Sequence, residues 1–323
     1  MVYKCRFLKK RVVSDYDPTA DETKSWELSD EALAAIWITI KGDFVAADKC
    51  WDTLSTLVTS LDVWLGGFNV VHYINTLTAI KMNSNLVNAR GMLMGNGVAI
   101  DDVMGITFPI VFGAPYLNQK MALPKDYSNR KILSMGLDIA NSEFDDLLID
   151  IAEVILPEGK PVGFIKQEEV SQAAQGTGDK DIWLQRNWDL LKILFKVPTV
   201  PVDTAWTKTI NRAGLEIDDF VFGYQSVPWE ILHGEMMNNQ GGMAGIENHF
   251  HADPSSGDTG FPENLESWER LFAEMDFFHD EDLYWKAPLS KASTAKLKLN
   301  LGVDEAFHYA QANYVPASSV LNI

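Results

Sequence analysis

Two stretches of alternating apolar and polar residues, one in each half of the chain, dominate the hydrophobic pattern. In residues 131–157 the alternation runs from Leu133 to Ile139, stops at a polar turn, and resumes from Leu147 until Pro157. Period-two alternation on both sides of a turn is typical of two antiparallel strands that bury one face. The pattern therefore predicts a β-hairpin that closes the first half of the chain.

The same design returns near the other end of the chain, in residues 296–316. Apolar residues alternate from Leu297 to Val303, a turn of glycine and acidic residues follows, and a second strand runs from Phe307 to Pro316. One hairpin of this kind is ordinary, but two, each closing half of the chain, indicate a duplicated β domain.

Other segments support the duplication. Strands are predicted in residues 34–45, in residues 60–80, where Gly66 and Gly67 mark a bend, and in residues 103–113, where Pro109 favours an edge or a bulge. Each half also carries a Met-Asn pair followed by a segment that we predict to be a loop; the pairs are Met82–Asn83 and Met237–Asn238. The shared order of these landmarks indicates two copies of one β unit.

Three helices are predicted between the strands. Asp181 is placed to cap a helix through Phe195, whose apolar stripe has near-helical spacing, and Pro198 follows as a stop. Residues 263–278 also have a helical pattern, and a short helix is expected in residues 166–175.

Short strands separated by long loops fit a jelly roll better than an immunoglobulin-like sandwich. The predicted fold is therefore mainly β, with two successive eight-stranded jelly-roll β-sandwiches and a few flanking helices. The expected domains are a basic N-terminal arm and strap (1–25), a first jelly roll (26–158), a linker with a helix (159–199) and a second jelly roll (200–323).

Composition limits the function further. The 323-residue chain has a formal net charge of −18, which argues against a general nucleic-acid binder. No run of about 18 apolar residues predicts a transmembrane helix, no signal peptide is expected, and two cysteines imply no disulfide framework and a reducing site of synthesis. The N-terminal arm is basic (Lys4, Arg6, Lys9, Lys10 and Arg11), whereas residues 253–282 are strongly acidic. Such an arm suits local contact with anionic lipid or nucleic acid.

Candidate chemistry is sparse. His249 and His251, with Asp253 nearby, form a His-x-His pair of the kind that jelly-roll metalloenzymes use, but no Glu follows at the spacing that cupins need. The remaining histidines are scattered singly, and paired acids such as Asp218–Asp219 are expected to form turns. We therefore expect no catalytic, cofactor-binding or metal-binding residue and no cofactor.

Two successive jelly rolls, flanking helices, a basic arm, the absence of a catalytic set and final strands stopped by proline resemble the double jelly-roll major capsid proteins. These proteins form the shells of adenoviruses and of tailless icosahedral viruses, commonly with an internal membrane. The strand from Ile106 to Gly113 is similar to the Phe/Pro/Phe-Gly strand of the first roll in such proteins. The resemblance covers about residues 34–316, although the second roll is short and its middle is rich in helix and loop.

The resemblance implies a structural virion protein that is not an enzyme. It would form homotrimers whose six rolls make a pseudo-hexameric capsomer, and it would contact neighbouring capsomers and other virion proteins such as a penton or spike. It would be made in the host cytoplasm and reside in the capsid. The basic arm would lie near internal lipid or genome, and deleting residues 1–13 is expected to leave the fold intact.

Two other functions stay open at this point. One is a bicupin-like metalloenzyme that uses His249 and His251. The other is a carbohydrate-binding viral spike protein in which surface tryptophans serve as platforms for sugars, although the apolar context of most tryptophans favours packing.

Overall fold

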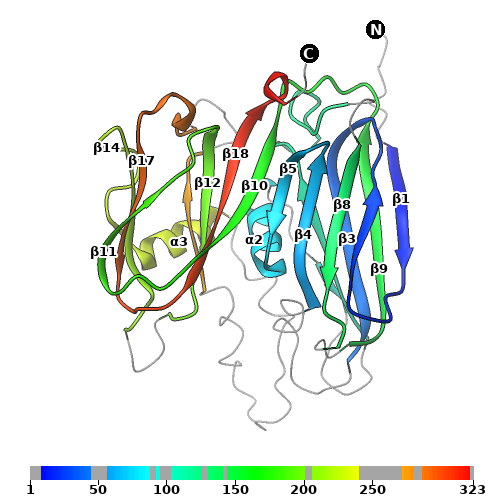
Figure 1. Cartoon of the computed structure of the whole chain (residues 1–323), viewed down its shortest axis with the longest axis horizontal. Helices are drawn as coiled ribbons and strands as arrows, with labels where there is room; N and C mark the ends of the chain where they lie inside the picture. The colour runs from blue at the N-terminus through cyan, green and yellow to red at the C-terminus, as the bar shows by residue number, and fades with distance from the viewer. Residues whose placement is uncertain are drawn as a thin grey trace. The chain divides into compact units, whose positions relative to one another are not determined.

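The computed structural model describes residues 9–44, 57–87, 92–94, 103–115, 117–125, 130–140, 144–200, 206–239, 271–278 and 286–320 (Figure 1). The chain divides into two compact units. Unit 1 holds the described residues up to Lys166 and from Val315 onward, and unit 2 holds those from Gln167 to Tyr314. Among the described residues, no helix is both long and apolar enough to cross a membrane.

Unit 1 is a sandwich of two antiparallel sheets. One sheet has the order β1 (Lys9–Tyr16), β9 (Phe144–Leu156), β3 (Ala32–Phe44), β7 (Val103–Val111) and β6 (Met92–Met94). The other contains, in order, β2 (Glu22–Glu27), β8 (Lys131–Leu137), β4 (Val58–Leu65) and β5 (Phe68–Tyr73). Helix α2 (Thr76–Val87) follows β5 and contacts β7.

Unit 2 is a sandwich of the same kind. One sheet contains, in order, β10 (Gly163–Gln172, in unit 2 from Gln167), β18 (Phe307–Pro316), β12 (Asp189–Lys196) and β16 (Phe272–Asp276). The other contains β11 (Gly178–Trp183), β17 (Ala295–Leu301), β13 (Ile210–Ile217) and β14 (Phe220–Val221), and β15 (Val227–Pro228) also pairs with β13. Helix α3 (Trp229–Asn239) contacts β16, β13 and β15.

The two units share one strand order. If the principal strands of each unit are numbered in chain order, leaving out the short β6 and β15, one sheet holds the first, eighth, third and sixth strands. The other sheet holds the second, seventh, fourth and fifth strands. The sequence-based prediction of two successive eight-stranded jelly rolls is therefore confirmed.

The predicted alternation decides which side chains enter each core. Ile36, Ile38 and Ile40 of β3 are at most 1% exposed, and Leu133 and Met135 of β8 are completely buried. Side chains of a strand alternate between its two faces, so each sheet presents one apolar face to the other. In unit 2 the same role falls to Leu215, Leu297 and Ile182, which line up on neighbouring strands of one sheet.

The two predicted hairpins are wrong in their pairing, although their strands are right. β8 pairs with β2 and β4, whereas β9 pairs with β1 and β3, so the two strands lie in different sheets. β17 and β18 are separated in the same way. Alternation indicates that a strand buries one face. It does not indicate whether the next strand pairs with it in the same sheet or lies in the opposite sheet of the sandwich.

The helix predicted from Asp181 is also wrong, because this segment forms β11 and β12. In β12 the residues from Asp189 to Phe195 are all buried. A strand buried on both faces reads as a continuous apolar run, which periodicity alone cannot separate from a buried helix.

Two other predicted helices are strands where the structure describes them. Phe272–Asp276 forms β16, while residues 263–270 lie outside the described residues, and the short helix expected at 166–175 is replaced by β10. Part of the predicted arm and strap is also ordered into strands, since Lys9–Tyr16 is β1 and β2 begins at Glu22.

The Met-Asn pairs occupy equivalent places in the two units, but in helices and not in loops. Met82 and Asn83 lie in α2, and Met237 and Asn238 lie in α3. Asn83 is fully buried; its Nδ2 donates to the Ala79 carbonyl oxygen at 2.8 Å and its Oδ1 accepts from the Val111 amide at 2.8 Å. This side chain therefore joins α2 to the end of β7.

Candidate functional site

The predicted histidine pair cannot be placed. His249, His251 and Asp253 lie outside the described residues. Among the described histidines, His72 Nδ1 lies 2.8 Å from Asp62, His233 Nδ1 lies 2.8 Å from the Phe272 carbonyl oxygen, and His308 Nδ1 lies 3.2 Å from Glu169. Within the described part of the chain, no group of three or more metal-ligating side chains comes together.

The acidic pair Asp218–Asp219 forms a turn, as predicted. Both residues have positive φ angles, 50° and 64°, and they connect β13 to β14. Asp218 Oδ1 accepts the backbone amides of Ser293 and Thr294, each at 2.7 Å. Asp tolerates the left-handed conformation when its carboxylate is satisfied locally, so this pair has a structural role.

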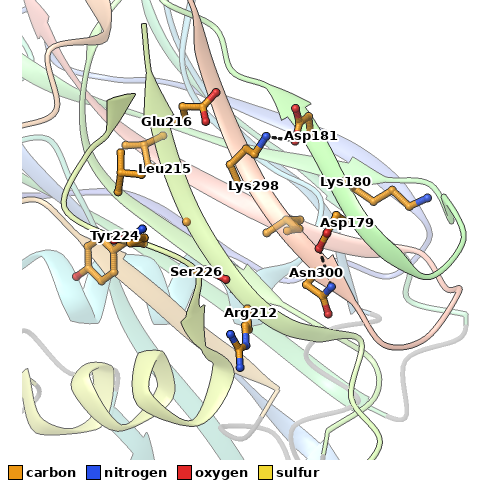
Figure 2. Close-up of a pocket in the computed structure, with 14 residues that line it drawn as sticks. Asp179, Lys180, Asp181, Arg212, Leu215, Glu216, Tyr224, Ser226, Lys298 and Asn300 are labelled. Atoms are coloured by element: carbon orange, nitrogen blue, oxygen red, sulfur yellow. Dashed lines mark hydrogen bonds and ion pairs between the residues drawn. The ribbon is translucent and has the colours of Figure 1, made fainter. Parts of the chain in front are cut away.

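A hollow of about 320 Å³ lies on the outer face of the β11–β17–β13 sheet in unit 2 (Figure 2). Gly214 is part of its lining, and a Cβ at this position would lie 2.9 Å from the Ser226 amide nitrogen and 3.0 Å from the Tyr224 carbonyl oxygen. The glycine lets the segment between β14 and β15 pass close over the middle of β13.

Two polar contacts join residues that line the hollow. Lys298 Nζ lies 2.7 Å from Asp181 Oδ1, and Asn300 donates to Asp179 at 2.7 Å; Figure 2 shows both contacts. These pairs are exposed to solvent, so their free energy contribution is small. The lining also includes Lys180 and Arg212, so the hollow carries charged groups besides the Lys298–Asp181 pair.

The tyrosine beside the hollow is held as a neutral hydrogen-bonding group. Tyr224 donates its hydroxyl proton to the Asp276 carbonyl oxygen at 3.2 Å and accepts the Asp276 amide at 2.9 Å. Burial, with nearby carboxylates, raises the pKa of Tyr224 well above its usual value. With both of its hydrogen-bonding roles in use, this hydroxyl is poorly suited to general acid–base catalysis.

Large exposed apolar side chains gather in unit 2. Seven are found among the described residues, and five of them belong to unit 2: Trp183, Trp206, Phe220, Val221 and Ile231. Neighbours on adjacent strands place Trp183, Lys296, Glu216 and Val221 in one row across the outer face of the sheet. Exposed aromatic side chains of this kind are enriched where proteins bind other molecules.

The ammonium group of Lys296, in the middle of this row, is held by two carboxylates and an aromatic ring. Lys296 Nζ lies 3.2 Å from Glu216 and 3.3 Å from Asp219, and it lies over the Trp183 ring at 5.0 Å from the centroid. These carboxylates raise the pKa of Lys296. This row is not among the sequence predictions, because Trp183 falls within the helix predicted from Asp181. The alternation of Asp179, Asp181 and Trp183 along one face is the signal that indicates a strand.

β1 is an exposed end strand with a basic first half. Among the described strands its one sheet neighbour is β9, and Val12 is 69% exposed. Arg11 Nε lies 3.7 Å from Oε2 of Glu153, a fully buried carboxylate whose Oε1 accepts the Ser29 amide at 2.5 Å. Burial raises the pKa of Glu153, and the Ser29 amide and Arg11 oppose that rise.

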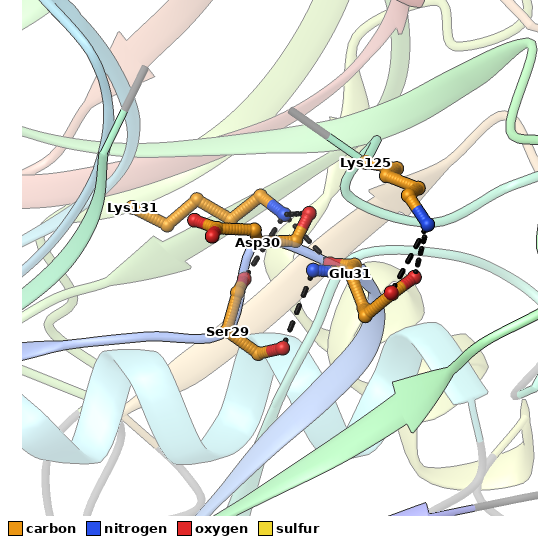
Figure 3. A network of polar contacts seen from close by, with 5 residues as sticks. All are labelled: Ser29, Asp30, Glu31, Lys125 and Lys131. Carbon is orange, nitrogen blue, oxygen red and sulfur yellow. Dashed lines mark hydrogen bonds and ion pairs between the residues drawn. The ribbon is translucent and has the colours of Figure 1, made fainter. Parts of the chain in front are cut away.

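A buried lysine fixes the connection between β2 and β3 (Figure 3). Lys131 Nζ donates to the carbonyl oxygens of Ser29, Asp30 and Glu31 at 3.1, 2.9 and 2.6 Å. The Glu31 carboxylate is paired with Lys125 at 2.8 Å. The arrangement uses all three ammonium donors of Lys131 on backbone groups, so its role is architectural.

Solved structures with the same fold include the capsid proteins of several viruses. The structure of the STIV MCP superposes with a TM-score of 0.67 and 11% identity, covering 98% of this chain and 100% of that chain. The major capsid protein P2 from bacteriophage PM2 gives a TM-score of 0.65 and 11% identity, covering 97% and 99%. The PBCV-1 virus capsid structure gives a TM-score of 0.65 and 9% identity, covering 97% of this chain and 95% of that chain.

Sequence comparison adds no relative to these structures: no protein-family model matches the chain, and no curated protein matches it. The resemblance lies in the fold and extends over nearly the whole chain and nearly the whole of each neighbour. The chain therefore has the double jelly-roll fold of viral major capsid proteins.

Proposed function

We propose that the chain is a structural virion protein, a major capsid subunit that self-assembles as pseudo-hexameric trimers into an icosahedral shell. One observation carries the proposal: both units have the same jelly-roll strand order within one polypeptide. Two like sandwiches per copy allow three copies to present six similar blocks around a ring. The full-length match to major capsid proteins of several viruses supports the same conclusion.

The proposal assigns the chain no enzymatic activity. The tyrosine beside the outer hollow of unit 2 donates a hydrogen bond to Asp276 and accepts one from it. The alternative bicupin-like metalloenzyme depends on His249 and His251. Metal analysis of the purified full chain separates the two functions, because one equivalent of bound transition metal would favour the enzyme.

Partners other than further copies of the chain are proposed from charge. Lys9, Lys10 and Arg11 lie in β1, which leaves Lys4 and Arg6 as the basic residues ahead of the first sheet. We propose that these two cations contact anionic lipid or the genome inside the virion. Co-sedimentation with vesicles that contain phosphatidylserine, compared between the full chain and a chain lacking residues 1–8, tests the lipid contact.

A second candidate function, carbohydrate binding, is favoured by one observation. Trp183 and Trp206 are 62% and 81% exposed, and exposed indole rings can stack on sugars. A glycan array with the full chain and with Trp183→Ala and Trp206→Ala variants tests it. Binding that both variants abolish would support the candidate.

Electron microscopy of the purified, concentrated protein tests the main proposal. We expect capsomers with pseudo-hexagonal outlines and, under assembly conditions, closed shells. A field of single particles of the size of one chain under all conditions would contradict the proposal.

A further inference from the structure

Among the end strands of the described sheets, β1 and β14 have opposite charge. The first is the β1 edge, residues 9–16. β1 pairs with β9 on one side and has no second sheet neighbour among the described residues. The edge contains Lys9, Lys10, Arg11 and Asp15, so its formal charge is three minus one, or +2.

The second open edge is the β14 edge, defined as residues 216–221 together with Lys296. β14 is the last strand of its sheet, and its Phe220 and Val221 are 76% and 52% exposed. Glu216, Asp218 and Asp219 supply three negative charges and Lys296 one positive charge, so the formal charge is −2. Side-by-side exposure of two apolar residues on an end strand is a liability that proteins normally cover.

Charge favours one of the possible pairings between these two edges. Two β1 edges would bring +2 against +2, and two β14 edges would bring −2 against −2; like charges at an interface disfavour such partners. The β1 edge against the β14 edge brings +2 against −2 and places exposed Val12 near exposed Phe220 and Val221. The positive charges of Lys9 and Lys10 disfavour pairing of β1 with a second β1, and they attract the negatively charged β14 edge.

We infer that the β1 edge of one copy of the chain docks along the β14 edge of a second copy. The inference rests on the proposed function and adds the surface through which copies join. β14 has only two residues, so side chains make most of the contact and backbone hydrogen bonds between the two copies contribute little.

This contact is heterologous, because the two surfaces differ. Each copy has one edge of each kind and therefore joins two neighbours. Heterologous contacts produce a closed ring when the rotation between copies closes and a filament when it does not. A closed ring is the outcome that agrees with the proposed capsomer.

Cysteine cross-linking in the full chain tests the contact. Val12→Cys and Phe220→Cys are introduced singly and together in a chain whose Cys5 and Cys50 are replaced by serine. We expect the double variant to form a ladder of disulfide-linked copies on a non-reducing gel, while each single variant runs as one chain. The matched control combines Val12→Cys with Ile231→Cys, another exposed apolar residue of unit 2, and should not cross-link.

A charge exchange supplies an independent measurement. Lys10→Glu should weaken association at least about tenfold, since it places like charges together, and Asp219→Lys should restore part of the loss in the double variant. Lys160→Glu, at an exposed lysine of unit 1 outside β1, serves as the control and should associate like the unmodified chain.

The outcomes separate this inference from the proposed function. An unmodified chain that stays monomeric would contradict the proposed function itself. If the unmodified chain assembles but Val12→Cys alone cross-links, or the double variant gives no ladder, the β1–β14 contact is wrong and the capsid function stands. If Lys10→Glu and the Lys10→Glu/Asp219→Lys double variant both associate like the unmodified chain, the β1–β14 contact is also wrong and the capsid function stands.

Discussion

Lys131 donates a hydrogen bond to the carbonyl oxygen of Glu31, one hundred positions away in the chain, at 2.6 Å (Figure 3). The same ammonium group binds the carbonyl oxygens of Ser29 and Asp30 and has no exposed surface. One buried side chain thus replaces the water that the turn between β2 and β3 would otherwise need.

Replacing Lys131 by Met should therefore destabilise the protein strongly. One buried and two partly buried carbonyl groups would lose their donor, and we expect a loss of about 3 kcal/mol in the free energy of unfolding. Urea unfolding followed by tryptophan fluorescence measures it. Lys125→Met is the control, since the partly exposed Lys125–Glu31 pair should contribute about 0–1 kcal/mol. Equal midpoints for the two variants would contradict this account.

The buried ion cluster of unit 2 should be similarly sensitive. Lys192 Nζ lies 3.2 Å from Glu274 and 3.2 Å from Asp276, and its side chain is 2% exposed. Burial lowers the pKa of Lys192, but the two carboxylates outweigh this effect and raise it overall, so the lysine stays charged.

Lys192→Met should cost about 3–5 kcal/mol, because it leaves two buried carboxylates without their cation. Adding Glu274→Gln and Asp276→Asn should recover part of that loss. Lys298→Met, which breaks the exposed pair with Asp181, is the comparison and should cost about 0–1 kcal/mol. If the triple variant is less stable than Lys192→Met, the cluster is not held by charge.

Glu153 should make stability fall as pH rises. Its pKa in the folded protein is raised above the ordinary value of 4.5, chiefly by burial. Between these two pKa values the folded state holds a proton that the unfolded state has lost, so unfolding becomes easier as pH rises through this window. Each pKa unit of difference corresponds to about 1.4 kcal/mol.

Glu153→Gln should remove this pH dependence and stabilise the protein at neutral pH. Glutamine keeps an oxygen for the Ser29 amide and carries no charge to bury. Thermal unfolding from pH 4 to pH 8, compared with the unmodified chain, is the measurement. A variant whose stability changes with pH as steeply as that of the unmodified chain would show that Glu153 is not the group responsible.

Truncation should separate the residues before β1 from β1 itself. Removing residues 1–8 leaves every residue of β1, so we expect unchanged thermal unfolding. Removing residues 1–13 also deletes Lys9–Val13, whose β-sheet partners on β9 run from Ile155 to Ala152, and should cost more than about 2 kcal/mol. The structure thus revises the expectation that this deletion leaves the fold intact. Equal stability of the two truncations would show that the β1–β9 pairing is dispensable.

The sequence was sufficient to predict the two sandwiches because most of their strands bury one face. Leu133, Met135, Leu297 and Leu299 alternate with polar residues, and they are in the cores of their units. Which strand lies beside which could not be read from alternation, because the same period fits a hairpin and a crossing between sheets. The pairing of β8 with β4, and not with β9, depends on contacts between distant parts of the chain.

The remaining errors have local physical causes. β12 is buried on both faces, and its apolar run includes Leu190, Leu191 and Ile193. Such a run has the same pattern as a buried helix, which is why the sequence predicts a helix here. The basic residues at the start of β1 hid a strand, since an end strand tolerates charge on exposed positions. The exposed Phe220 and Val221 could not be told from core residues, because exposure depends on which strand is last in its sheet.

The mass of the purified chain in solution, measured by light scattering coupled to size exclusion, tests the capsid account most directly. One chain has a mass of 36.1 kDa. The account predicts a stable species of three times that mass, with larger assemblies at higher protein concentration. A single species of 36.1 kDa at every concentration, in buffers that preserve virions, would contradict it.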